Sequence, residues 1–230
     1  MLKFVLAAVA VFPAGSVFAQ DGSQVHEAAI AGDGALSVTA EIWVDNWFQL
    51  YANGAPMFQD SVPYATERSF NAERVTFTAD LPLTIAVEFR DFMQNDTGLE
   101  YIGTDRQKIG DGGAIAQFRN AATGAVMAVT DANWRCQVVQ QAPVSDDCAA
   151  AADPEVGVGS CASTTVAVSP DWTAPEFDDQ TWAAATEHSA RSVDPKGGYD
   201  AIDWDRSARL IWSADLLHDN IVLCRTTITK

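Results

Sequence analysis

Hydrophobic and polar residues alternate along much of the chain, and this alternation predicts β-strands. Leu36, Val38, Ala40, Ile42 and Val44 fall on one face of their run, which is the two-residue period of a half-buried strand. Further runs of this kind predict strands over 47–52, 75–79, 83–89, 114–119, 125–129, 164–168, 210–213 and 221–228. Many short strands with turn residues between them are typical of an antiparallel sandwich, so the pattern predicts an all-β fold of two sheets.

Turn and loop residues separate these runs. Asn53-Gly54 is the strongest hairpin signal in the chain, because both residues accept positive φ angles. The prolines of 56–63 predict a long loop, and 191–205 is a polar, glycine-bearing loop. Asp178 is the predicted N-cap of a single helical turn. No long amphipathic helix is predicted, which argues against βαβ units.

The amino terminus has the three parts of a secretory signal peptide. Lys3 precedes an apolar run over 4–12, and the segment ends in small and apolar residues at Ala19. We predict a signal peptide over 1–19 with cleavage after Ala19, rather than a buried N-terminal strand. The apolar run is too short for a permanent anchor, and no later segment could span a bilayer as an apolar helix. The expected product is a secreted, periplasmic or extracellular protein without an integral membrane segment.

The rest of the chain predicts one domain. Residues 20–35 are small and polar and are expected to form a loose lead-in. Residues 36–230 contain no internal repeat and no linker-like stretch, so they are expected to form a single β-sandwich domain. A cysteine-bearing loop around 136–161 interrupts the strand pattern.

Four cysteines in an exported chain favour disulfides. Cys148 and Cys161 flank an Ala-, Gly- and Ser-rich loop, and Cys136 and Cys224 lie in strand-like runs. Of the three possible connectivities, we predict Cys136–Cys224 and Cys148–Cys161. A zinc site built from all four cysteines is the alternative, but no C-x-x-C pair supports it.

The charge excludes some partners. The chain carries 31 acidic and 14 basic residues, a net charge of −17, while 48% hydrophobic residues provide for a folded core. Nucleic acid is disfavoured because phosphate contacts need Lys and Arg, and anionic membrane surfaces are disfavoured for the same reason. The acidity favours neutral or cationic ligands.

Three segments together resemble a known family. They are VDNWFQLYANG over 44–54, the pair IAQF over 115–118 and VTDANW over 129–134, and DWTAPEFDDQTW over 171–182. In this order they resemble galactose-binding-like jelly-roll modules, similar to the non-catalytic sugar-binding domains of bacterial α-L-rhamnosidases and β-galactosidases. The resemblance implies a two-sheet jelly roll that binds carbohydrate or glycoconjugate. The chain departs from the family in the cysteine-bearing loop and in standing alone.

Aromatic residues in polar loops are the candidates for sugar binding. Exposed rings can stack on sugar C–H groups, and neighbouring polar groups can bind hydroxyls. The predicted ligand-binding set is Trp172, Tyr199, Asp200, Asp203, Trp204, Asp205 and Arg206. We expect Trp134, Trp182 and Trp212 to be core residues. Trp43 is expected either to cover the outer face of a sheet or to pack under a loop.

Metal and catalytic patterns are weaker. A structural calcium ion is a hypothesis, with Asp105, Asp111, Asp178 and Asp179 as its possible ligands. No H-E-x-x-H or G-x-S-x-G pattern is present, so we predict a non-catalytic protein. An extracellular or envelope protein–protein interaction domain is the alternative. A small glycan-active hydrolase, with Glu41 paired to Glu88 or Asp91, is more remote.

Overall fold

The computed structural model describes residues 25–30, 34–63, 71–91 and 94–229. The signal peptide predicted over 1–19 lies outside the described residues. The strands are β1 (Val25–Ala29), β2 (Leu36–Asp45), β3 (Trp47–Ala52), β4 (Ala55–Gln59), β5 (Ala72–Ala79), β6 (Leu83–Arg90), β7 (Leu99–Glu100), β8 (Lys108–Ile109), β9 (Gly113–Asn120), β10 (Val126–Val129), β11 (Arg135–Gln141), β12 (Thr164–Thr165), β13 (Ala183–Ala184), β14 (Thr186–His188), β15 (Leu210–Trp212) and β16 (Asp219–Ile228). The short helices are η1 (Asp146–Ala150), η2 (Gly159–Cys161), α1 (Ala190–Val193) and η3 (Gly197–Ala201).

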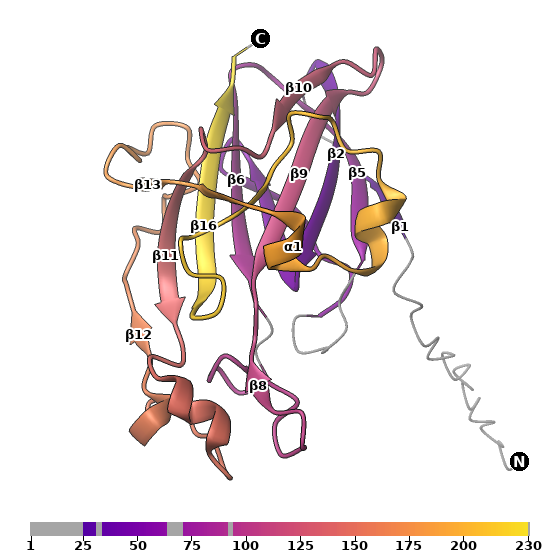
Figure 1. The fold of residues 1–230 in the computed structure, drawn as a ribbon. Coiled ribbons are helices and arrows are strands. Elements are labelled where there is room, and N and C mark those ends of the chain that lie inside the picture. The colour runs from indigo at the N-terminus through magenta and orange to yellow at the C-terminus, as the bar shows by residue number, and fades with distance from the viewer. Residues whose placement is uncertain (1–24, 31–33, 64–70, 92–93, 230) are drawn as a thin grey trace, which may run out of the picture.

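Most strands belong to two sheets (Figure 1). Sheet A has the order β1-β5-β2-β9-β15-β14, with β10 paired to β9. Sheet B has the order β12-β11-β16-β6-β3-β4, with β13 paired to β11. The strand pairs are antiparallel except for β1 with β5. The described residues therefore confirm the all-β prediction.

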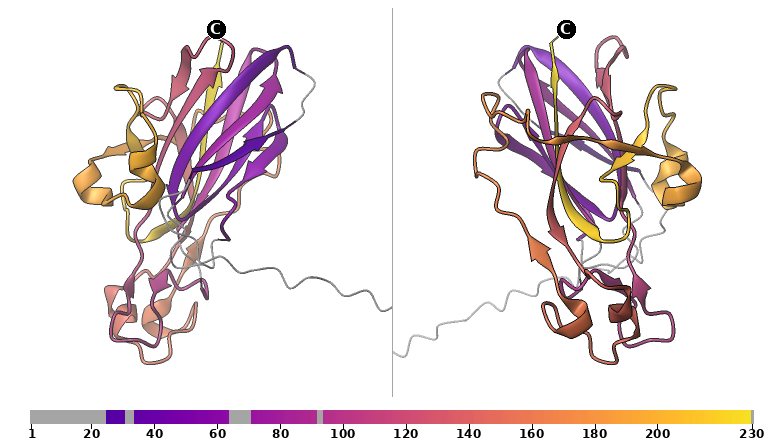
Figure 2. Two further views of the ribbon diagram at one scale, coloured as in Figure 1. Left: turned by 90° about the vertical axis from the view of Figure 1, so that its right-hand side faces the viewer. Right: turned by 60° about the vertical axis from the view of Figure 1, so that its left-hand side comes forward.

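The core lies between the two sheets, which Figure 2 shows as two layers. Alternate residues of each strand point into it, because side chains of a strand alternate between faces. Phe48 and Phe89 come from sheet B, and Phe118 and Trp212 come from sheet A. Trp134, Trp182 and Trp212, which were expected to be core residues, are all buried. Trp134 and Trp212 belong to the core between the sheets, whereas Trp182 packs against Trp172 and Phe177.

Several strands lie where none was predicted, among them β1 and β4. β1 lies in the expected loose lead-in: Glu27 pairs with Arg74 at 2.7 Å, and His26 Nδ1 lies 2.7 Å from Glu73. β4 lies in the expected long loop, and Pro56 within it is tolerated because β4 is an edge strand of sheet B. Neither strand has a clear hydrophobic period of its own. β1 depends on pairing with the distant β5, and β4 depends on pairing with the adjacent β3.

The predicted helical turn after Asp178 is wrong. The Asp178 carboxylate accepts a hydrogen bond from the backbone N–H of Gln180 at 3.0 Å, which closes a turn instead of capping a helix. The chain then enters β13, which pairs with β11. The polar loop predicted over 191–205 also differs, because it contains most of α1 and all of η3.

Both predicted disulfides are confirmed. Cys136–Cys224 joins β11 to β16 within sheet B, at positions directly opposite each other. Cys148–Cys161 joins η1 to η2. Together with Leu99 these two cysteines form a separate small core, so 94–112 and 143–163 make a lobe at one end of the sandwich (Figure 1). We call this the disulfide lobe.

Candidate functional site

The predicted loop residues lie on the outer face of sheet A. Trp43, an outward-facing residue of β2, is fully buried beneath the loop, and its ring contacts Tyr199 edge-on at 5.8 Å. Trp204 is half-buried: its ring lies 5.9 Å from Tyr199, and its indole N–H donates to the Tyr199 carbonyl at 2.9 Å. The aromatic rings of this loop therefore pack down onto the sheet.

The polar residues of the loop are anchored through β9. The Gln117 amide accepts from the Asp205 backbone N–H at 2.7 Å and donates to the Asp203 carbonyl at 3.1 Å. The Asp205 carboxylate accepts from the backbone and hydroxyl of Ser207, which lowers its pKa. Asp200, Asp203 and Arg206 are exposed. The sugar-binding role of these residues stays a prediction.

Trp172 lies on the opposite sheet from the rest of the predicted set. Its ring meets Tyr51 of β3 edge-on at 5.5 Å and lies 6.2 Å from Trp182. The segment around it covers part of the outer face of sheet B, where Arg225 donates to the carbonyls of Ala174 and Phe177. The structure therefore divides the seven predicted ligand-binding residues between two faces.

The outer face of sheet B carries a second group of aromatic and polar side chains, which we call the platform. It consists of Trp47, Gln49, Tyr51, Glu88, Arg90, Gln137 and Trp172, all partly exposed. Strand register places Gln49 opposite Glu88 and Trp47 opposite Arg90. Leu223 lies between Glu88 and Gln137 in the same row. The strand residues of the platform thus lie on β3, β6 and β11, and the buried Leu223 of β16 lies between those of β6 and β11.

Charged groups in the platform are paired. Arg90 donates to Glu88 at 2.5 Å, and its guanidinium lies 5.4 Å from the centre of the Trp47 ring. Partial burial raises the pKa of Tyr51, and the nearby Glu88 carboxylate adds to this, against an opposite effect of Arg90. The phenol is therefore neutral and able to donate a hydrogen bond.

The sequence contains a signal for the platform. Trp47, Gln49 and Tyr51 alternate with the core residues Phe48 and Leu50, so they must face outward. The alternation does not predict whether another segment of the chain covers these side chains.

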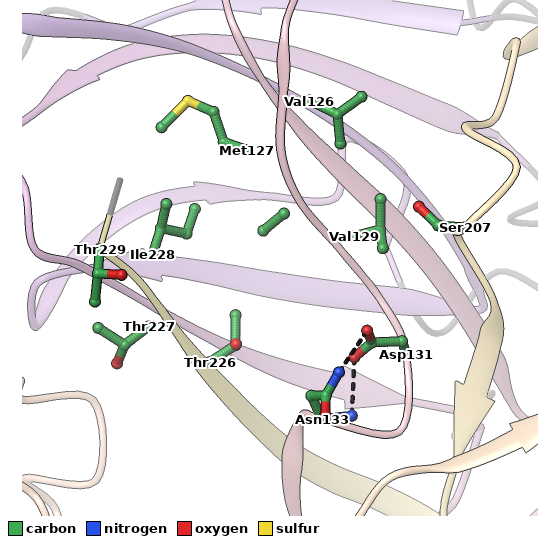
Figure 3. Close-up of a pocket in the computed structure, with 11 residues that line it drawn as sticks. Val126, Met127, Val129, Asp131, Asn133, Ser207, Thr226, Thr227, Ile228 and Thr229 are labelled. Atoms are coloured by element: carbon green, nitrogen blue, oxygen red, sulfur yellow. Dashed lines mark hydrogen bonds between the residues drawn. The ribbon is translucent and has the colours of Figure 1, made fainter.

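A cleft of about 390 Å³ lies at the end of the sandwich that carries the C-terminus (Figure 3). Val126–Val129 of β10 forms one wall, and Thr226–Thr229 forms the other. Asp131 and Asn133 lie at its rim and hydrogen bond to each other, with Asn133 Nδ2 2.8 Å from Asp131. No residue of the predicted set lines this cleft within the described part of the chain.

The acidic residues considered for catalysis are not brought together. Glu41 lies on the outer face of sheet A, where it pairs with Arg74 at 2.8 Å. Glu88 lies on the outer face of sheet B, so the core separates the two carboxylates. Asp91 is buried just beyond the end of β6.

Two of the carboxylates predicted as calcium ligands form ion pairs with basic side chains. Asp111 pairs with Lys108, and Asp179 pairs with Arg225. Across the described ranges, no group of three or more His, Cys, Asp or Glu residues could hold a metal ion. The four predicted calcium ligands therefore belong to no such group.

A buried acidic cluster closes one edge of the sandwich. Glu73 accepts hydrogen bonds from Ser61 Oγ at 2.6 Å and Asn71 Nδ2 at 2.6 Å, and it also contacts His26. Asn71 Nδ2 reaches Asp60 at 3.3 Å. The Glu73 carboxylate thus contacts both Ser61 and His26. Its contacts join β1, β5 and the end of β4.

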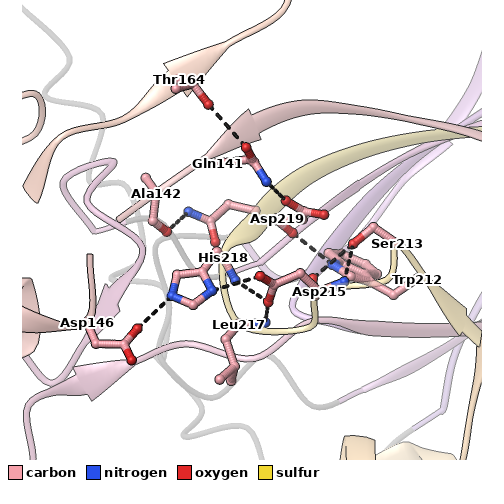
Figure 4. A network of polar contacts seen from close by, with 11 residues as sticks. Gln141, Ala142, Asp146, Thr164, Trp212, Ser213, Asp215, Leu217, His218 and Asp219 are labelled. Carbon is pink, nitrogen blue, oxygen red and sulfur yellow. Dashed lines mark hydrogen bonds and ion pairs between the residues drawn. The ribbon is translucent and has the colours of Figure 1, made fainter. Parts of the chain in front are cut away.

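His218 links the disulfide lobe to the sandwich (Figure 4). Its Nδ1 lies 2.9 Å from Asp215, and its Nε2 lies 2.9 Å from Asp146 of η1. An ionised carboxylate only accepts hydrogen bonds, so both ring nitrogens must carry protons for both contacts to form. Partial burial opposes the charge, but the bonds to Asp215 and Asp146 outweigh it and raise the pKa of His218.

The His218 link predicts a pH-dependent attachment of the lobe. Because the pKa of the folded state is raised, the stabilisation is complete below about pH 6.5 and is lost as pH rises through the higher folded value. We expect Asp146→Asn to lower the free energy of unfolding at pH 5.5 by less than about 1 kcal/mol, since Asp146 is exposed. Asp147→Asn, on the same short helix, is the control. Urea unfolding at pH 5.5 and 9 measures both, and equal effects of the two variants would contradict the link.

Comparison with protein-family models, with curated proteins and with solved structures finds no match to this chain. Within the described ranges, no helix has the length and apolar character needed to cross a membrane.

Proposed function

We propose that the chain is a secreted, non-catalytic module that binds neutral carbohydrate on the platform of sheet B. The observation that carries the proposal is a group of aromatic, amide and carboxylate side chains on one sheet face, in which Trp47 lies opposite Arg90 and Gln49 lies opposite Glu88. The resemblance of 44–54 and 171–182 to galactose-binding-like jelly-roll modules supports the same function, and both segments contribute platform residues.

The chemistry of the platform suits a sugar. The face of an aromatic ring offers apolar surface to sugar C–H groups, while amide and carboxylate groups bind hydroxyls. Trp47 and Tyr51 are four residues apart, about 13 Å along a strand, which suits an oligosaccharide rather than a single sugar. Gln49 and Glu88 lie between them in the strand register.

The charge of the chain favours a neutral ligand. Arg90 is already paired with Glu88, and the net charge of −17 repels acidic glycans at low salt. We therefore expect neutral oligosaccharides to bind better than sulfated or uronic-acid glycans.

The proposal predicts that platform variants lose sugar binding. A glycan array with the mature protein identifies a ligand, and calorimetry then measures its affinity. We expect Trp47→Ala and Tyr51→Ala each to weaken binding about tenfold, because each removes a ring that stacks on the sugar.

Trp204→Ala compares the platform with the sugar site that the sequence predicted in the loop over sheet A. Trp204 is also half-buried, but it lies over sheet A. It should leave affinity unchanged while thermal melting confirms that all variants are folded. Absence of binding to every neutral glycan, or an equal loss in Trp204→Ala, would contradict the proposal.

A further inference from the structure

We propose that the cleft at the C-terminal end of the sandwich binds an extended, positively charged peptide, which adds as a strand to the free edge of β16. This interaction is separate from sugar binding on the platform. It rests on the backbone pairing around the cleft, on the residues that line it and on their charge.

The edge of β16 is open at the cleft. The pairing of β11 with β16 ends at Arg135 opposite Arg225, whereas the pairing of β6 with β16 continues to Leu83 opposite Ile228. From Thr226 to Ile228, β16 therefore has a strand neighbour on one side only among the described residues. Backbone N–H and C=O groups of such an edge are ready to pair with another chain.

The opposite wall of the cleft is also an edge strand. β10 pairs with β9 and with no other strand in the described part of the chain. The Val129 carbonyl at its end already accepts from the Trp134 indole N–H at 2.8 Å. The cleft between β10 and β16 is thus bordered by two strand edges (Figure 3).

The cleft has an apolar floor and a polar rim. Met127 packs against the core, and Ile228 belongs to it. Thr226 and Thr229 line the same cleft with hydroxyl groups. A strand docked here would place alternate side chains on the apolar floor and toward solvent, which is how strand addition obtains specificity. The cleft volume of about 390 Å³ suits a segment of a few residues.

Charge selects the occupant. Asp131 is the one charged side chain among the described residues that line the cleft. The chain as a whole has a net charge of −17, which favours cationic over anionic partners. A Lys or Arg side chain beside Asp131 completes the recognition of an otherwise apolar and hydroxyl-bearing strand.

Hydrogen exchange with a synthetic peptide tests the proposal. The probes are the capped hexapeptide KTVTVK, its acidic counterpart ETVTVE and the strand-breaking KTPTPK, each at millimolar concentration. We expect KTVTVK to slow amide exchange in 226–229 and to bind at least tenfold more tightly than either of the others. This measurement uses the unaltered protein and does not depend on the folding of a variant.

A pair of variants locates the site. Met127→Lys places a charge on the cleft floor and should weaken KTVTVK binding at least tenfold. Thr164→Lys adds the same charge on β12, an exposed edge strand of sheet B away from the cleft, and should have no effect. The proposal is overturned if KTVTVK leaves exchange in 226–229 unchanged, if ETVTVE or KTPTPK binds equally well, or if both variants lose binding to the same extent.

Discussion

Replacing Cys136 and Cys224 together by alanine is expected to lower the free energy of unfolding by about 4–5 kcal/mol. The bridge joins residues 88 positions apart, and closing so long a loop removes much of the conformational entropy of the unfolded chain. Both sulfur atoms also pack in the core between the sheets, so their removal leaves a cavity. Urea unfolding of the double variant against the wild type measures the loss.

The second disulfide provides the comparison. Cys148 and Cys161 are 13 positions apart, which predicts a smaller loss of about 3 kcal/mol for their double alanine variant. Because this bridge holds the disulfide lobe and not sheet B, faster hydrogen exchange should be confined to 94–112 and 143–163. An equal loss in both double variants would contradict the loop-length argument.

Asp60→Asn is expected to remove a large pH dependence of stability. Burial raises the pKa of Asp60 to about 8, and the charge of Glu73 adds to this, against hydrogen bonds from Val62 and Asn71. The unfolded value is near 3.9. Between these values the folded protein binds one more proton than the unfolded chain, so stability falls as pH rises from about 4 to about 8.

The expected difference is large. Each pH unit in this window costs about 1.4 kcal/mol, so the Asp60 contribution falls by about 4 kcal/mol between pH 5 and pH 8. Asparagine resembles the protonated acid: its oxygen can still accept from the Val62 N–H, which lies 2.9 Å from Asp60 Oδ1. Urea unfolding of both proteins at several pH values should therefore give curves that separate above about pH 4, with the variant more stable. Parallel curves would show that Asp60 is ionised in the folded protein.

Asp45 is expected to contribute a second pH dependence of stability, with the same sign as that of Asp60. It is fully buried, and burial followed by the charges of Asp111 and Glu100 raises its pKa well above its usual range. The contribution of Asp45 to the pH dependence of stability is the same in the wild type and in Asp60→Asn. The difference in stability between the two proteins therefore reports on Asp60 alone.

Local pattern was sufficient for the main strands and the disulfides. The alternation of Val38, Ala40 and Ile42 identifies β2 and also its buried face, because side chains of a strand alternate between two sides. Cys136 and Cys224 lie in two such strands, and the exported context favours their oxidation. These features depend on residues close in sequence or on the type of residue.

Local pattern was not sufficient for β1, β4 and the candidate site. β1 exists because β5 supplies its hydrogen-bonding partner and Glu73 and Arg74 its charge partners, and these residues lie more than 40 positions away. The loop expected to expose Trp204 instead folds onto sheet A, where Gln117 and Trp43 hold it. These contacts depend on the folded sheet, so the position of the loop cannot be predicted from its own residues.

Trp43 and Trp47 show this division most simply. Both face away from the core by the alternation of their strands, and the sequence determines that much for each. Trp43 is nonetheless fully buried, because 196–204 covers it on sheet A, whereas Trp47 remains partly exposed on sheet B. The sequence by itself determined strands, core face and disulfides, while only the tertiary structure decided which outward-facing side chains stay exposed, because that depends on which distant segment covers them.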